Sequence, residues 1–163
     1  GRRVLLIVDE AQNLNPAALE SLRMLSNINA DKDQLLQMIL VGQPQLREML
    51  RRPDLRQFAQ RVSAHFFIDP LDEAEVAGYI RHRIKVAGRI KPLFFPSASR
   101  RIAEITKGVP RSINILCDTT LVYGYSAGAK RIDVDLVDEV VRDQIEYGVL
   151  APDGADIVGR KDG

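Results

Sequence analysis

Several features that define other classes of protein are scarce in this chain of 163 residues. It has one cysteine, Cys117, and two histidines, which excludes an internal disulfide and leaves no Cys/His cluster with zinc-ligand spacing. Cys117 lies among apolar residues and is predicted to be buried in a helix. No apolar run approaches the about 20 residues that a membrane-spanning helix requires. The formal net charge is only +1, which gives no overall attraction to nucleic acid or acidic membranes. These absences favour a globular protein of the reducing cytoplasm.

The first half of the chain alternates between strand and helix patterns. Residues 4–8 form a continuous apolar run, which predicts a strand buried on both faces. Asn15 and Pro16 are typical of an N-cap and a first helical residue, and a second buried strand is expected over residues 35–41. A strand, a helix and a strand of these lengths predict a parallel, right-handed crossover. Alternating apolar residues over 62–68 predict a third strand, less deeply buried.

The second half is predicted to be helical. Asp72 and Glu75 have the spacing of a capping box, and further helices follow with apolar residues along one face. The last residues are rich in glycine and charge, which is typical of a linker or a disordered tail. We therefore expect an α/β part over residues 1–70, a helical part over 71–147 and a tail over 148–163.

Two adjacent acids follow the first predicted strand. Asp9 and Glu10 would lie at the carboxyl end of a parallel strand, where ligands bind in open α/β sheets. This pair suits nucleotide hydrolysis, because one carboxylate can organise Mg²⁺ while the other polarises an attacking water. In the alternative interpretation, Asp9 only caps the following turn and Glu10 is a solvated surface residue.

Polar and cationic residues at three other places are candidates for the same site. If the two strands are neighbours, the amide of Gln43 lies beside the acids, although glutamine is also common in turns before a proline. Arg111 opens a helix, either as a surface residue or directed towards a ligand at the domain junction. Five arginines recur through the region after the second strand, either as a solvated face or as paired donors to phosphate. They are Arg47, Arg51, Arg52, Arg56 and Arg61.

Four motifs in this order resemble AAA+ ATPases of the general secretion pathway protein A type. Similar modules occur in pilus-biogenesis, exopolysaccharide-export and transposition ATPases. The resemblance spans roughly residues 4–141 and implies the parallel-sheet part of a P-loop AAA+ core, truncated at its N-terminus and followed by an all-α lid. The motifs are LLIVDEAQNL at 5–14, LVGQPQL at 40–46, LRQFAQRV at 55–62 and GVPRSINILCD at 108–118.

The resemblance also implies roles for individual residues. Asp9 corresponds to the Walker B acid that holds Mg²⁺, and Glu10 to the catalytic base. Gln43 falls at sensor 1, where the superfamily more often has Asn, Thr or Ser, so the residue type here departs from the family pattern.

The arginine roles follow from the same resemblance. Arg61 corresponds to the arginine finger that is offered to a neighbouring subunit, with Arg56 as the alternative. Arg111 corresponds to sensor 2, the lid residue that contacts the γ-phosphate. The residue pattern does not decide which arginine acts in trans.

The phosphate-binding loop of the family does not occur in the sequence. No Gly-x-x-x-x-Gly-Lys-Ser/Thr is present, and Gly1 falls almost at the start of the Walker B strand. We therefore expect a fragment of a longer protein. ATP and Mg²⁺ would be bound by the full-length parent and not by this chain. The sheet would have open edges, which predicts self-association through them or through AAA+ contacts.

The predicted function is part of an ATP-hydrolysing AAA+ module in a bacterial assembly protein of the general, type II secretion pathway. The parent is expected to be an ATPase at the cytoplasmic face of the inner membrane, acting with secretion-system components. This chain alone is expected to be inactive without the upstream phosphate-binding loop. One alternative is a transposition- or nucleic-acid-linked ATPase that uses the Arg47–Arg61 surface. Another is an interaction module without catalysis.

Overall fold

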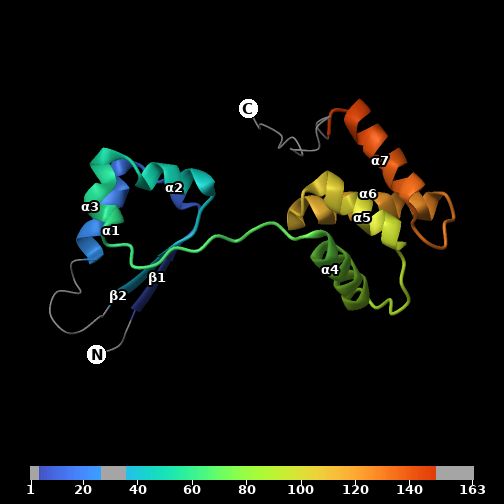
Figure 1. Ribbon diagram of the computed structural model, residues 1–163, viewed down its shortest axis with the longest axis horizontal. Helices are drawn as coiled ribbons and strands as arrows, with labels where there is room; N and C mark the ends of the chain where they lie inside the picture. Colours follow the sequence, from blue (N-terminus) through green and yellow to red (C-terminus); the bar gives the residue numbers. More distant parts are fainter. Residues whose placement is uncertain (1–3, 27–35, 150–163) are drawn as a thin grey trace. The chain divides into compact units, whose positions relative to one another are not determined.

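The computed structural model describes residues 4–26 and 36–149 and is shown in Figure 1. The chain divides into two compact units between Phe67 and Ile68. Strands and short helices make up the described part of the first unit, and helices make up that of the second. The predicted order, an α/β part followed by an all-α part, is confirmed.

The first unit contains a parallel pair of strands. β1 (Val4–Val8) pairs along its whole length with β2 (Leu36–Leu40). Between them in sequence lies α1 (Pro16–Ser26), which begins with the predicted N-cap: the Asn15 side chain accepts a hydrogen bond from the Ala18 N–H at 2.8 Å. The strand–helix–strand order that the sequence predicts is therefore present.

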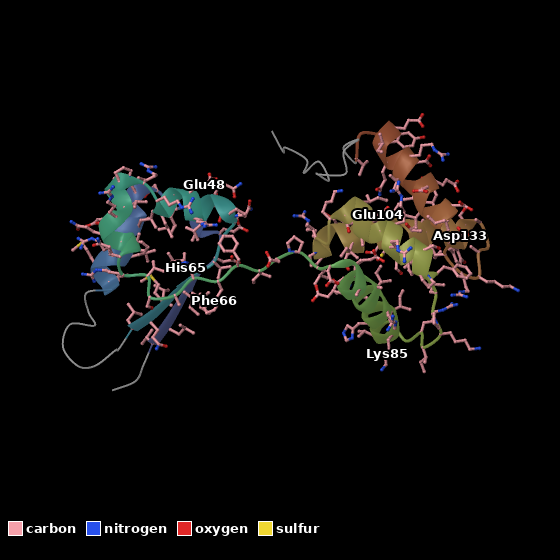
Figure 2. All side chains as sticks on the ribbon, in the orientation of Figure 1. Glu48, His65, Phe66, Lys85, Glu104 and Asp133 are labelled. Atoms are coloured by element: carbon pink, nitrogen blue, oxygen red, sulfur yellow. The ribbon has the colours of Figure 1, made fainter. Side chains whose placement is uncertain are left out.

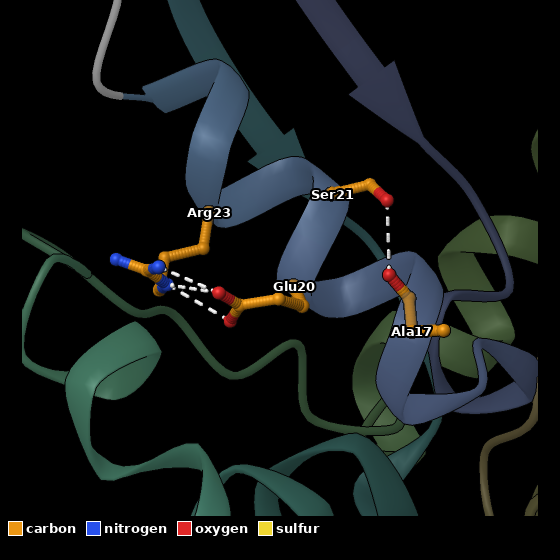
Figure 3. Close-up of polar contacts among 4 residues, drawn as sticks. All are labelled: Ala17, Glu20, Ser21 and Arg23. Carbon is orange, nitrogen blue, oxygen red and sulfur yellow. Dashed lines mark hydrogen bonds and ion pairs between the residues drawn. The ribbon is translucent and has the colours of Figure 1, made fainter.

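Figure 3 shows polar contacts between residues of α1. The Arg23 guanidinium pairs with the Glu20 carboxylate one turn earlier at 2.5 Å, and this hydrogen bond lowers the pKa of Glu20. The Ser21 hydroxyl donates to the Ala17 carbonyl at 3.0 Å. The apolar side of α1, with Leu19 and Leu22, packs in the core of this unit.

Short helical elements complete the first unit. They are α2 (Pro44–Leu50), η3 (Pro53–Leu55) and α3 (Arg56–Ala59). Proline begins both α2 and η3, where its missing N–H costs no helical hydrogen bond. The buried core consists of Leu19, Leu55 and Phe58, with Leu40 of β2 packed against it.

The prediction that β1 and β2 are deeply buried is wrong. Leu5, Ile7 and Ile39 share one face of the strand pair and are 53%, 59% and 47% exposed. Leu40 points to the opposite face, where it packs against the core that includes Leu19. The face that includes Leu40 is half-buried, because the described helices of this unit cover that side only.

The predicted third strand is also wrong. Residues 62–68 have no regular secondary structure and pair with neither β1 nor β2. Phe66 and Ile68 are almost fully exposed, so the alternating apolar pattern has no core to pack on. A strand needs ladder hydrogen bonds as well as alternation, and this segment lacks them.

The second unit has four described helices: α4 (Glu73–Val86), α5 (Pro96–Thr106), α6 (Pro110–Ser126) and α7 (Val134–Glu146). The predicted capping box begins α4, because the Glu75 N–H donates to Asp72 at 2.8 Å and the Asp72 N–H donates back at 2.9 Å. The Asp133 carboxylate caps α7 in a similar way.

One apolar core joins these helices. Its most deeply buried members include Val76, Ile102, Ile113 and Val137, one from each helix. Cys117 is buried among them as predicted, and burial raises the pKa of its thiol to about 12. The thiol is therefore a neutral packing group at physiological pH.

Gly108 fixes the start of α6 against the chain that leads into α4. Its φ is +75°, and its carbonyl accepts the Leu71 N–H at 3.0 Å. A Cβ at this position would lie 1.9 Å from the Leu71 carbonyl oxygen. Only glycine fits here, so the position of α6 depends on this residue.

Candidate functional site

The two acids lie where β1 ends. Strand pairing continues past the end of β1, because the Val41 N–H donates to the Val8 carbonyl at 2.8 Å and the Ala11 N–H donates to the Val41 carbonyl at 2.9 Å. Asp9 and Glu10 fall within this stretch and are exposed. The carboxyl ends of the two strands therefore meet beside the acids.

The backbone turns sharply at Glu10. Its φ of 51° and ψ of 38° lie in the left-handed region, which is uncommon for a residue other than glycine. The Asp9 carboxylate accepts the Glu10 N–H at 2.8 Å, and the short helix η1 (Ala11–Asn13) begins directly afterwards. Strained backbone of this kind is frequent at functional sites.

Gln12 joins the two strand ends. Its carbonyl oxygen accepts the backbone N–H of Gln43 at 3.1 Å, and its amide group donates to the Glu10 carboxylate. The Gln43 amide lies 3.5 Å from the same Glu10 oxygen, Oε2. A Cβ on Gly42 would come within 2.7 Å of the Gln12 oxygen, so glycine permits this close approach. The two amides hold the Glu10 side chain in one orientation.

Gln12 and Gly42 are candidate functional residues that the sequence patterns did not predict. Both lie inside recognised motifs, but their contact depends on the left-handed turn at Glu10. A glutamine two residues after an acid carries no pattern that would predict this contact.

The arginines occupy other parts of the chain. Arg56 opens α3 and Arg61 lies two residues beyond its end; both are exposed and belong to the first unit, as the acids do. Arg111 is the second residue of α6 in the second unit and is also exposed. The hydrogen-bonded site thus consists of Glu10, Gln12 and Gln43 with Asp9 beside them, and the arginine roles stay predictions.

We expect Gln12→Leu to lower the free energy of unfolding of the first unit by about 1–2 kcal/mol. The substitution removes the acceptor of the Gln43 N–H and a donor to Glu10 while keeping similar volume. Urea unfolding followed by circular dichroism measures the change. Gln45→Leu, at an exposed position of α2, is the matched control. Equal effects of the two substitutions would contradict the bridging role.

Known proteins match this chain in sequence. A family model described as an AAA domain matches residues 1–50. General secretion pathway protein A of Aeromonas hydrophila is 44% identical over 132 residues, which is 81% of this chain and 24% of that protein. In sequence this chain is therefore similar to the AAA+ ATPases of the general secretion pathway protein A type, as predicted. It spans about a quarter of the length of this relative.

Solved structures show the same fold at lower identity. The RuvB Holliday junction branch migration motor of Thermotoga maritima matches with a TM-score of 0.69 and 21% identity, covering 96% of this chain and 48% of that one. A mutant of the same motor matches with a TM-score of 0.67 and 21% identity, covering 95% and 48%. This likeness shows a shared fold, in agreement with the match to the AAA domain model.

None of the helices in residues 4–26 and 36–149 is both long enough and apolar enough to cross a membrane.

Proposed function

We propose that this chain is part of an ATP-binding and ATP-hydrolysing AAA+ module in a bacterial secretion-pathway assembly protein. The observation that carries the proposal is the cluster at the carboxyl ends of β1 and β2. There Asp9 and Glu10 are exposed, and the amides of Gln12 and Gln43 meet one oxygen of Glu10. Ligands of open α/β sheets bind at this edge.

Asp9 is suited to hold Mg²⁺. Its Oδ1 accepts a backbone N–H, while the residue is exposed enough to present carboxylate oxygen to a ligand. The part of the chain that the structure describes has no group of three or more His, Cys, Asp or Glu that could enclose a metal. Mg²⁺ in nucleotide sites typically takes one or two carboxylates and completes its shell with water and phosphate oxygens, so this set fits. Mg²⁺ would neutralise charge on the phosphates.

Glu10 is the proposed general base. Its carboxylate is held through Oε2 by the Gln12 and Gln43 amides, which fixes the direction in which it can accept a proton from water. Gln43, at the sensor 1 position, both orients Glu10 and presents an amide to phosphate or water. Gln12 acts through its neighbours as a positioning residue.

The arginines are proposed to stabilise phosphate charge. Arg111 would contact the γ-phosphate as sensor 2, with the helices of the second unit acting as the lid. Arg61, or Arg56, would reach the nucleotide of a neighbouring subunit. Planar guanidinium groups suit this task because they bind phosphate through paired hydrogen bonds.

The wider setting is proposed from the relative's name. A module of the general secretion pathway protein A type would act with secretion components at the cytoplasmic face of the inner membrane. The open face of the β1–β2 pair, with Leu5, Ile7 and Ile39, is the proposed region of self-association. Apolar strand faces and unpaired edges are prone to such contacts.

The 163-residue chain should bind Mg-ATP only weakly, with a dissociation constant no tighter than about 1 mM, and should not hydrolyse it measurably. The reason is that no Gly-x-x-x-x-Gly-Lys-Ser/Thr sequence is present to surround the phosphates with backbone N–H groups. Isothermal titration calorimetry and a phosphate-release assay measure the two quantities. Micromolar affinity would show that the chain holds phosphate by groups other than those proposed.

A further inference from the structure

The second unit carries a run of cations without balancing acids. Residues 76–103 contain seven Lys and Arg and no Asp or Glu, although the whole chain has a net charge of only +1. Arg100 and Arg101 in this run are paired with acids. The others extend from α4 into the loop that follows it, and Figure 2 shows Lys85 near the end of α4. The positive charge is therefore concentrated around this helix end.

A hydrogen bond and a cation–π contact join a second cationic loop to the first. The Arg89 guanidinium donates to the Lys130 carbonyl at 3.3 Å. The Arg131 guanidinium lies over the Phe95 ring, 3.7 Å from its centroid. We call the resulting cluster the basic end. It consists of Lys85, Arg89, Lys91, Lys130 and Arg131.

The cations of the basic end are exposed and, within the described residues, form no ion pair with an acid. The next acid along the chain is Asp133, whose carboxylate accepts the Leu136 N–H at 3.0 Å as the cap of α7. The positive charge of the cluster is thus available to an external partner.

Two aliphatic side chains stand between these cations. Val86 is 73% exposed and Ile90 is 88% exposed, and their sequence neighbours are Lys85, Arg89 and Lys91. Proteins that rest on membranes combine the same elements: apolar side chains enter the boundary with the acyl chains, and Lys and Arg stay level with the lipid phosphates.

We propose that the basic end is a docking surface for an anionic membrane. Val86 and Ile90 insert at the interface, and the five cations bind lipid phosphates by charge. Val86 and Ile90 are aliphatic, which favours lipid over nucleic acid, because single-stranded nucleic acid binds by stacking on aromatic side chains. The ring of Phe95 is covered by Arg131. The exposed Tyr125, at the end of α6 that leads into the second loop, also suits lipid, because tyrosine is enriched at membrane–water interfaces. The inference rests on charge and exposure in the second unit and does not depend on nucleotide hydrolysis.

Vesicle co-sedimentation of the whole chain tests this docking. Vesicles with phosphatidylglycerol as about a third of the lipid should bind it, and pure phosphatidylcholine vesicles should bind it far less. Lys85→Gln with Lys91→Gln should weaken binding roughly 30-fold at low salt, since each interfacial cation contributes about fivefold. Ile90→Ser should weaken binding roughly tenfold through lost apolar burial. Raising the salt should release the protein, because screening acts on the charge component.

Matched variants exclude general effects of charge and apolarity. Arg142→Glu on α7 and Met24→Ser on α1 change exposed residues elsewhere and should leave binding within about twofold. Circular dichroism melting confirms that each variant is folded. Binding that is equal on both vesicle types, or unchanged in the Lys85/Lys91 and Ile90 variants, would overturn the proposal. Binding to a duplex or single-stranded oligonucleotide that exceeds binding to anionic vesicles would also overturn it.

Discussion

Glu10→Gln is expected to abolish nearly all ATP hydrolysis in a protein that joins this chain to the preceding segment of its Aeromonas hydrophila relative. Loss of a general base lowers rates by about 10²–10⁴-fold. Glutamine keeps a side-chain oxygen that can accept from the Gln12 and Gln43 amides, so the local hydrogen bonds survive while the proton acceptor is lost. A steady-state phosphate-release assay measures the rate, and fluorescent-nucleotide binding should stay within a few-fold of the unsubstituted protein.

The matched control for this result is Glu48→Gln. Glu48 is an exposed glutamate on α2 of the same unit and is labelled in Figure 2. Its substitution makes the same change of charge outside the site and should leave hydrolysis nearly unchanged. Full activity of Glu10→Gln in an otherwise active protein would mean that the acids after β1 do not act in the reaction.

Gly108→Ala should destabilise the second unit by about 3–4 kcal/mol, which is at the upper end for a point substitution. An added Cβ would meet the backbone of Leu71, whose carbonyl oxygen lies 1.9 Å from the Cβ position. Backbone atoms cannot rotate away as a flexible side chain can. To avoid this clash, the two segments would have to separate and lose the hydrogen bond from the Leu71 N–H to the Gly108 carbonyl. That hydrogen bond holds the start of α6 in place. Urea unfolding followed by circular dichroism measures the change.

Gly128→Ala separates the steric clash from the cost of the backbone conformation. Gly128 also has a positive φ, of +66°, but a Cβ there would meet nothing within 4 Å. Its substitution should cost only the about 1–2 kcal/mol of placing a side chain in the left-handed region. If both substitutions cost the same, the close contact between Gly108 and Leu71 does not constrain the fold.

Local signals in the sequence predicted most of the secondary structure. Asn15 before Pro16, and Asp72 with Glu75, place hydrogen-bonding side chains at helix starts, and the structure contains both caps. Capping depends on residues three or four positions apart, so sequence alone can reveal it. The order of strand, helix and strand was predictable for the same reason.

Burial and strand pairing were not predictable to the same degree. Leu5 and Ile7 are apolar, yet their exposure depends on which elements cover that face of the strand pair. The alternating residues 62–68 resemble a strand, but pairing requires a partner from elsewhere in the chain. Both errors arise because long-range contacts, and not local pattern, decide the outcome.

The candidate site was predicted only in part. Parallel pairing places Gln43 near Glu10, which sequence reasoning could anticipate from the order of elements. The contacts of Gln12 depend on the left-handed backbone at Glu10 and on the lack of a side chain at Gly42, so its role could not be predicted from the sequence. Such geometry has no signature in residue types alone.

Mn²⁺ line broadening in an NMR spectrum of the joined protein with bound nucleotide tests the metal site at the end of β1 most directly. Mn²⁺ replaces Mg²⁺ at oxygen sites, and its unpaired electrons broaden amide signals nearby. We predict selective loss of the signals of residues 9–13 and 41–43, and their recovery in Asp9→Asn. Broadening centred on other acids, such as Asp133 and Asp135 at the start of α7, with residues 9–13 unaffected, would contradict a nucleotide-metal site at this edge of the sheet.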